Sequence, residues 1–260
     1  MSKHAVRNLT KARLAGLTAL LGAFCSSGCQ YFRSASSPIP HVAYRSPGGD
    51  AETLVVLLPG IDSRATDFAE NGWVDRIHAA APRADVIAVD AHFGYYRTES
   101  LVTRLQEDLL RPLQHAYEQV WMVGVSLGGL GAALYAAAHP GEVDRMLLLA
   151  PYTGRPAVFE EVLVAGGLDR WDPPSKTDLN PEQRAYVTAW ELFQRAARDE
   201  LGAPQIFLGF GAEDGFRVPN GVLASALPQQ RCFTQPGGHT WSVWTPLFER
   251  MLAAAVADAR

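Results

Sequence analysis

The chain of 260 residues has few cysteines, no apolar run long enough to cross a bilayer and no excess of positive charge. Its three cysteines, Cys25, Cys29 and Cys232, are too few for a disulfide framework or a cysteine metal cluster. Lys and Arg number 23 against 27 Asp and Glu, so nothing suggests the basic surface that nucleic-acid binding requires. These absences leave an ordinary globular chain, and its 48% hydrophobic content is enough for a sizeable core.

Motifs of nucleotide-binding and metal-dependent enzymes are also missing from the sequence. No G-x-G-x-x-G follows the first apolar run, which argues against Asp90 as a ribose-binding acid of a dinucleotide fold. No cluster of His, Asp and Glu has the spacing of metal ligands, and H-E-x-x-H is absent. We therefore expect neither a cofactor nor a metal.

The first 28 residues differ in kind from the rest of the chain. Four basic residues and no acid precede the apolar run LAGLTALLGAF, which is followed by CSSGC. A run of about 11 residues is too short to span a bilayer, for which about 20 are needed, and it fits the core of a signal peptide. We therefore predict a signal peptide over residues 1–28 and an exported protein.

The small residues before Cys29 resemble the lipobox of bacterial lipoproteins, although Ser26 stands where that motif usually has Leu. This resemblance implies cleavage before Cys29, lipidation of that cysteine and a lipid anchor in the outer membrane of the bacterial cell envelope, facing the periplasm. Ser26 and Gly28 also satisfy the small-x-small rule of ordinary secretory cleavage. An uncleaved apolar anchor, or a start codon placed upstream of a cytoplasmic enzyme, are the alternatives.

Cleavage after residue 28 would leave 19 basic and 27 acidic residues and a net charge of −8. That balance favours solubility and does not indicate an anionic partner. Cys232 would then remain as a free thiol, which we interpret as a small core residue. The polar stretch QYFRSASSPIP ends in prolines, so residues 29–40 are predicted to form a flexible tether.

From about His41 the chain alternates between short apolar runs and longer helical patterns. Continuous apolar runs are typical of strands that helices cover on both faces. The alternation predicts an α/β fold with a doubly wound, mostly parallel sheet over residues 41–260. The predicted strands lie at 53–59, 84–90, 119–125, 145–151, 204–211 and 230–235, and the predicted helices at 69–81, 99–117, 127–139, 219–227 and 241–259.

About fifty residues separate two of these strands, which is too many for a single connection. The stretches 155–167 and 181–200 have helical patterns, and the proline-containing turn WDPPSKTD lies between them. We predict a short helical lid insertion at about 152–201 that forms the roof of a substrate pocket, and its apolar content suits an acyl or aryl group.

The pentapeptide GVSLG, with Ser126 at its centre, lies between an apolar strand pattern and an alanine-rich helical pattern. G-x-S-x-G in this context is the signature of a nucleophile elbow, in which a tight turn holds the serine above the sheet. Gly124 and Gly128 are needed because side chains there would clash. The alternative is a tight turn without catalytic function.

With this motif and its context, the sequence resembles the α/β-hydrolase superfamily from about Thr53 to the C-terminus. The resemblance implies a catalytic triad in the chain order Ser, acid, His. Asp214, in AEDGF after the last predicted strand but one, is in the position of the acid. His239, in PGGHTW after the final strand, is in the position of the base. Glu213 is the main rival for the acid and His92 for the base.

The chemistry explains why these three residue types are needed together. A serine hydroxyl is a poor nucleophile at neutral pH, so an imidazole must accept its proton, and a buried carboxylate must orient that imidazole. Two backbone N–H groups must also face the oxyanion. Leu127 is expected to supply one of them, and Ile61, in the turn LLPGIDS, the other, with Asp62 as the fallback.

The sequence as a whole predicts an exported serine hydrolase that cleaves carboxylic esters of small molecules through an acyl-enzyme on Ser126. An acyltransferase or a thioesterase would use the same residues. A peptidase is less favoured, and a non-catalytic envelope lipoprotein with the same fold is the alternative from another class. Aromatic residues that could line an acyl pocket, though such residues more often belong to the core, are Tyr95, Tyr96, Trp171, Trp190, Trp241 and Trp244.

Overall fold

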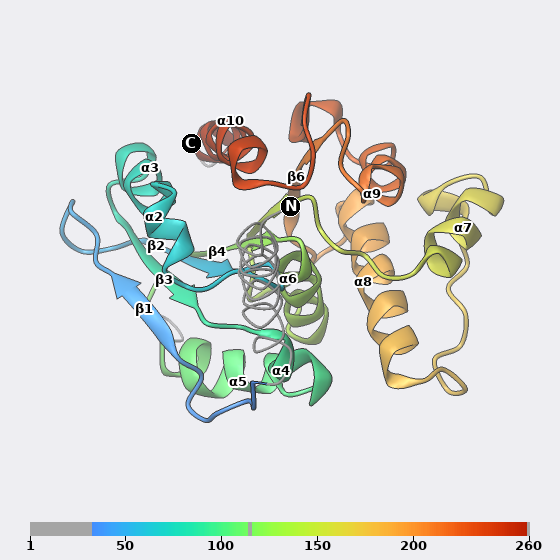
Figure 1. Ribbon diagram of the computed structural model, residues 1–260, viewed down its shortest axis with the longest axis horizontal. Helices are drawn as coiled ribbons and strands as arrows, with labels where there is room; N and C mark the ends of the chain where they lie inside the picture. Colours follow the sequence, from blue (N-terminus) through green and yellow to red (C-terminus); the bar gives the residue numbers. More distant parts are fainter. Residues whose placement is uncertain (1–32, 114–115, 259–260) are drawn as a thin grey trace, which may run out of the picture.

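The computed structural model describes residues 33–113 and 116–258, which form a seven-stranded sheet in the order β1-β3-β2-β4-β5-β6-β7 (Figure 1). The strands from β2 to β7 run parallel to one another, and β1 pairs with β3 in the antiparallel direction. The strands are β1 (His41–Tyr44), β2 (Thr53–Leu58), β3 (Ala84–Val89), β4 (Gln119–Val125), β5 (Arg145–Leu149), β6 (Gln205–Gly211) and β7 (Cys232–Gln235). The predicted parallel α/β sheet and its six strands are confirmed.

Strand β1 was not predicted, because its four residues alternate between exposed and half-buried positions and contain no continuous apolar run. His41 is the first residue of β1 and pairs with Val89 at the edge of the sheet. At the other edge Cys232 begins β7, where its half-buried thiol donates to the Ala224 carbonyl at 3.6 Å and burial raises its pKa.

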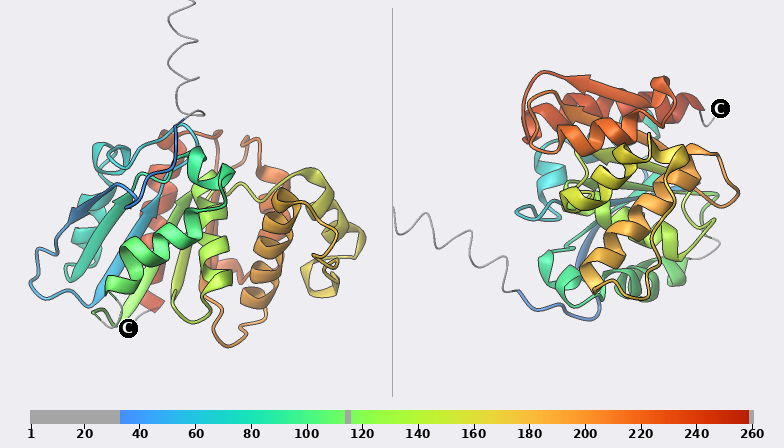
Figure 2. Two further views of the ribbon diagram at one scale, coloured as in Figure 1. Left: turned by 90° about the horizontal axis from the view of Figure 1, so that it is seen from below. Right: turned by 90° about the vertical axis from the view of Figure 1, so that its right-hand side faces the viewer.

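Helices cover both faces of the sheet, as Figures 1 and 2 show. Helices α3 and α10 contact each other on one face, and α5, α6 and α8 lie on the other. On the α10 face lie α2 (Asp67–Glu70), α3 (Trp73–Ala80) and α10 (Trp241–Asp258). The remaining helices are α4 (Phe93–Arg97), α5 (Leu101–Arg104), the π-helix η1 (Leu105–Leu110), the 3₁₀ turns η2 (Arg111–Leu113), η3 (Leu168–Arg170) and η4 (Gln229–Arg231), α6 (Leu127–Ala138), α7 (Pro156–Val164), α8 (Pro181–Ala197) and α9 (Arg217–Ala224).

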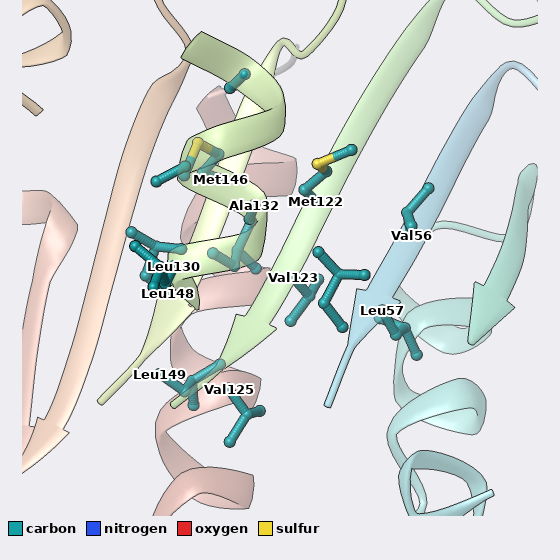
Figure 3. Close-up of a cluster of buried hydrophobic side chains, with 14 of the residues drawn as sticks. Val56, Leu57, Met122, Val123, Val125, Leu130, Ala132, Met146, Leu148 and Leu149 are labelled. Atoms are coloured by element: carbon teal, nitrogen blue, oxygen red, sulfur yellow. The ribbon is translucent and has the colours of Figure 1, made fainter. Parts of the chain in front are cut away.

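One part of the core lies where α6 packs against the central strands (Figure 3). Met122 and Val123 of β4 and Leu148 of β5 are at most 1% exposed, and Leu130 and Ala132 of α6 lie against the same strands. Fully burying a side chain of this size stabilises the fold by about 1.5–3 kcal/mol. This packing fixes α6 against β4, and therefore fixes the turn that joins them.

The segment between β5 and β6, predicted as a lid, contains α7, η3 and α8. Helix α8 begins with a capping box, in which Asn180 accepts from the Gln183 N–H at 2.9 Å and the Gln183 side chain accepts from the Asn180 N–H at 3.1 Å. Trp190 of α8 donates to the Thr153 carbonyl at 2.9 Å. These bonds attach α8 to the chain that leaves β5, and the lid role stays a prediction.

Residues 33–40, the described part of the predicted tether, lie against the domain. Arg33 forms an ion pair with Asp90, and Ser36 donates its N–H to the Tyr95 hydroxyl at 3.2 Å. The Ile39 side chain is 1% exposed, so this stretch contributes to the core. The predicted signal peptide and Cys29 lie outside the described residues.

None of the helices in the described part of the chain combines the length and the apolar character needed to cross a membrane.

Candidate active site

The site lies at the carboxyl edge of the sheet, where parallel strands of such folds present their loops. Ser126 follows β4 directly, and the turn containing Ile61 follows β2. Asp214 lies three residues beyond β6, and His239 lies four residues beyond β7. Because these strands run in one direction, the topology brings the four loops to the same edge of the sheet.

Ser126 lies on a sharp turn between β4 and α6. Its backbone has φ 52° and ψ −116°, a combination that a non-glycine residue keeps only where the surrounding structure enforces it. Three backbone hydrogen bonds do so here. The Ser126 N–H donates to Leu149 at 2.9 Å, and the Ser126 carbonyl accepts from Gly129 at 3.0 Å and from Tyr152 at 2.9 Å. The turn has the strained geometry of a nucleophile elbow.

At the two glycines of the pentapeptide, neighbouring backbone segments pack in close contact. A Cβ on Gly124 would lie 2.6 Å from the Gly128 carbonyl oxygen, and a Cβ on Gly128 would lie 2.1 Å from the Leu58 oxygen. Both distances are far below van der Waals contact, and both obstacles are backbone atoms that cannot rotate away. The spacing G-x-S-x-G is therefore a steric requirement of β2, β4 and α6 at this point.

The turn after β2 lies beside the elbow. A Cβ on Gly60 would lie 3.4 Å from the Ser126 Cβ, and Ile61 lines the same cavity as Ser126 and Leu127. Leu127 is the first residue of α6, so its N–H has no acceptor within the helix. The backbone hydrogen bonds of the described residues include none donated by the Ile61 N–H. Neither of the two N–H groups named from the sequence thus donates to a backbone carbonyl among the described residues, and their role at an oxyanion stays a prediction.

His239 and Asp214 form a hydrogen-bonded pair. The His239 Nδ1 lies 2.8 Å from the Asp214 Oδ2, and the carboxylate is fully buried while the imidazole is 32% exposed. The other carboxylate oxygen, Oδ1, accepts from the Phe216 N–H at 2.8 Å. The rings of Phe216 and Trp244 lie edge-on to the imidazole, with centroids 5.0 Å and 4.7 Å away. These contacts fix both the tautomer and the plane of the ring.

Phe216 lines the cavity together with Ser126 and contacts the His239 ring. The described hydrogen bonds include none between the Ser126 hydroxyl and His239. Catalytic hydrogen bonds of enzymes are often long before substrate binds and shorten in the complex.

The two rivals for acid and base have other partners. Glu213 accepts from the Gly237 N–H through its side chain and donates its own N–H to the Gly237 carbonyl at 3.1 Å. It therefore holds the loop that carries His239. His92 is the N-cap of α4, where its Nδ1 accepts from the Gly94 N–H at 3.1 Å and the residue is 3% exposed. Burial, followed by the charge of Arg33, lowers the pKa of His92.

A cavity of about 900 Å³ has Ser126, Leu127 and Ile61 on its wall. This volume is within the range of pockets that enclose small molecules. Helices α4 and α5 supply a largely apolar side, which includes Phe93, Leu101 and Val102. The segment after β5 and the first turns of α8 supply a more polar side, which includes Tyr152, Glu182, Arg184, Tyr186 and Thr188.

Of the aromatic residues predicted as candidates for an acyl pocket, Tyr95 and Tyr96 line the cavity, and the four tryptophans do not. Trp171, Trp190 and Trp244 are buried in the core, and Trp241 packs against it. Sequence reasoning missed Phe93, Tyr152, Tyr186 and Phe216. The signal for Tyr152 was its place three residues after β5, at the same edge of the sheet as Ser126. The pattern of α8 gives no signal for the register that turns Tyr186 toward the cavity.

A profile described as the alpha/beta hydrolase fold matches residues 78–199. This range includes the elbow and ends before Asp214 and His239. A 2-hydroxy-6-oxononadienedioate/2-hydroxy-6-oxononatrienedioate hydrolase of Paraburkholderia xenovorans is 33% identical over 124 residues, which are 45% of this chain and 42% of the relative. The match therefore spans less than half the length of that relative.

Solved structures align over most of the described fold. An S-formylglutathione hydrolase of Staphylococcus aureus aligns with a TM-score of 0.55 at 14% identity, over 86% of this chain and 98% of that one. A carboxylesterase structure from Nitrososphaera gargenis aligns with a TM-score of 0.52 at 16% identity, over 88% of this chain and 99% of that one. At these identities the alignments establish the fold.

Proposed function

We propose that this chain, which has the α/β-hydrolase fold, is a serine hydrolase that cleaves carboxylic esters. The observation that carries the proposal is the strained backbone of Ser126 on the wall of the cavity, at the same sheet edge as the His239–Asp214 pair. Strain of this kind costs about 1–3 kcal/mol and persists where the surrounding structure enforces it, often at functional sites. The hydrolases and the carboxylesterase of the same fold support the proposal.

In the proposed reaction each of these groups has one role. The Ser126 hydroxyl attacks the acyl carbon while the His239 imidazole accepts its proton, and Asp214 stabilises the imidazolium. The carbonyl oxygen becomes an oxyanion that accepts from the Leu127 and Ile61 N–H groups. His239 then gives the proton to the departing alkoxide, which leaves as the alcohol. Water attacks the resulting acyl-enzyme by the reverse sequence and releases the acid and free Ser126.

Two features of the elbow favour this charge development. The N-terminus of α6 carries a partial positive charge that stabilises an anion beside Ser126. Tyr96 donates its hydroxyl to the Leu127 carbonyl at 3.1 Å, and burial keeps the Tyr96 pKa far above its ordinary value. This bond holds the first residue of α6 in place, so that its N–H keeps its direction.

We test the proposal with Ser126→Ala and a p-nitrophenyl ester of a short acid. Hydrolysis by the full chain should fall to the background rate, because the residue that forms the acyl-enzyme is lost, while the circular dichroism spectrum stays unchanged. Ser46→Ala is the matched control, because this serine donates to the Pro82 carbonyl far from the cavity and should leave turnover unchanged. Undiminished hydrolysis by Ser126→Ala would reject the mechanism.

The acceptor of the acyl group is a separate part of the proposal. An acyltransferase or a thioesterase would use the same residues, and product analysis with added alcohol or thiol separates them from an ester hydrolase.

We also propose that the chain is exported and attached to the membrane through a lipid on Cys29. Incorporation of labelled palmitate that disappears in Cys29→Ala tests the attachment independently of activity.

A further inference from the structure

Two tyrosines form a short hydrogen-bonded chain on the polar side of the cavity. The Tyr152 and Tyr186 hydroxyls are 3.0 Å apart, and the Tyr186 hydroxyl donates to the Glu182 carboxylate at 2.6 Å. Arg155 donates to the same carboxylate oxygen at 3.2 Å. Tyr152, Glu182 and Tyr186 all line the cavity. The chain therefore runs from the solvent-exposed Arg155 to the substrate space.

Glu182 determines which hydroxyl donates in each of these hydrogen bonds. The Tyr186 hydrogen bond, together with Arg155, lowers the pKa of Glu182 below its ordinary value, so the carboxylate is ionised and only accepts. Burial, followed by that carboxylate, raises the pKa of Tyr186, so the phenol keeps its one proton and donates it to Glu182. The bond between the tyrosines must then be donated by Tyr152. The proton of Tyr152 is thereby used, and its oxygen is left as an acceptor.

The position of this oxygen is fixed relative to Ser126. The Tyr152 N–H donates to the Ser126 carbonyl at 2.9 Å, and its ring lies 5.5 Å from that of Phe216. On the other side, a Cβ on Gly154 would lie 2.4 Å from the ring of Tyr186, so this glycine provides the space in which the ring sits. The Tyr152 hydroxyl oxygen is therefore separated from the Ser126 backbone by about the length of one tyrosine side chain.

We propose that Tyr152 is a specificity-determining residue that accepts a hydrogen bond from a hydroxyl group on the substrate, so that the preferred substrates are esters whose cavity-filling part carries a hydroxyl. The proposal rests on the proposed function for its reaction, and it names the substrate class of that site. Tyr186 and Glu182 act on the substrate through Tyr152, as positioning residues.

The test compares methyl esters of 4-hydroxyphenylacetic and 4-hydroxycinnamic acid with their counterparts that lack the hydroxyl or carry a methoxy group. For at least one of the two acids, the full-length protein should show a kcat/KM about 3- to 10-fold higher for the hydroxy ester than for the deoxy ester, the effect of one added hydrogen bond. Tyr152→Phe should bring this ratio to about 1, because the acceptor is gone.

Tyr186→Phe gives the sharper result. It removes the acceptor of the Tyr152 proton, so the freed hydroxyl can donate, and the methoxy ester should gain relative to the deoxy ester while the hydroxy preference falls. Tyr95→Phe is the matched control, because this tyrosine also lines the cavity but its hydroxyl bonds to Ser36. It should keep the hydroxy-to-deoxy ratio. An unchanged ratio in Tyr152→Phe overturns the proposal.

Binding separates this proposal from the proposed function. In the Ser126→Ala background, calorimetry with the free 4-hydroxy and deoxy acids should show the same preference, and Tyr152→Phe should abolish it. If no ester is hydrolysed but this preference is present, the substrate assignment stands and the hydrolase mechanism fails. If esters are hydrolysed but neither kcat/KM nor binding depends on the hydroxyl, the mechanism stands and the substrate assignment is wrong.

Discussion

The elbow and the α8 side of the cavity border the same space, but different kinds of contact hold them. At the elbow, backbone meets backbone, and glycines 124 and 128 leave no room for a Cβ. On the α8 side, side chains such as Asn180, Tyr186 and Trp190 hold the segment through hydrogen bonds to partners outside the helix or at its first turn. We infer that the elbow tolerates few substitutions, because its shape depends on backbone contacts. On the α8 side, substitution of side chains can alter which substrates the cavity accepts.

The largest effect is expected at Asp214, the acid that orients the base His239. Asp214→Asn keeps the shape of the side chain but no longer favours the Nδ1–H tautomer of His239, so kcat for ester hydrolysis should fall by roughly three to four orders of magnitude. Steady-state kinetics measure this loss. Glu213→Gln is the control, since its amide oxygen still accepts from Gly237, and it should lose less than about tenfold. Equal losses in both variants would contradict the assignment of Asp214 as the acid.

Gly128→Ala tests whether the elbow tolerates a Cβ atom at this position. The new methyl group would meet the Leu58 carbonyl oxygen, so the free energy of unfolding should fall by about 3 kcal/mol or more, as measured by urea denaturation. Gly221→Ala is the matched control in α9, where nothing lies within 4 Å of the added methyl group. It should stabilise the protein by up to about 1 kcal/mol. A mild loss in Gly128→Ala would show that the elbow can relax.

A smaller effect, on the pH dependence of stability, is expected at the N-terminus of α4, which lies on the apolar side of the cavity. His92 must be neutral at Nδ1 to accept from Gly94, and burial lowers its pKa below the value of about 6.5 in the unfolded chain. The unfolded chain therefore binds the proton more readily, and the stabilisation that is complete above about pH 6.5 is lost as the pH falls toward the folded-state pKa.

His92→Asn keeps a good N-cap that does not titrate in this range. The unfolding free energy of the unmodified chain should fall relative to that of His92→Asn between pH 7 and pH 5, and the two should run parallel above pH 7. Urea titrations at unit steps of pH measure this difference. Curves that stay parallel down to pH 5 would show that His92 does not titrate on unfolding.

The sequence could predict the parts of the molecule that depend on local pattern. Continuous apolar runs identified the six parallel strands, and the spacing of Gly124, Ser126 and Gly128 follows from the close approach of three backbones. The relation of Asp214 to His239 was implied by the resemblance to the α/β-hydrolase superfamily, whose chain order of serine, acid and histidine these two loops match. The same reasoning could not exclude Glu213 or His92, whose partners were visible only in three dimensions.

The parts that the sequence did not predict depend on contacts between distant residues. Strand β1 has no apolar run because it lies at the sheet edge, and it is a strand through its pairing with β3. Residues 33–40 looked polar enough for a tether, but Ile39 is buried and Ser36 bonds to Tyr95 across the fold. The tyrosine pair of residues 152 and 186 joins two segments that only the packing of α8 brings together.

The central claim is that Ser126 is a nucleophile activated by His239 and Asp214. Its most direct test is labelling with a fluorophosphonate, which reacts covalently with activated serines, followed by mass spectrometry of the peptides. We expect one adduct, on Ser126, that is absent in Ser126→Ala and forms much more slowly in His239→Gln, while His41→Gln at the sheet edge is labelled at the normal rate. No adduct on Ser126 in the folded protein, or an adduct that forms equally fast in His239→Gln, would contradict it.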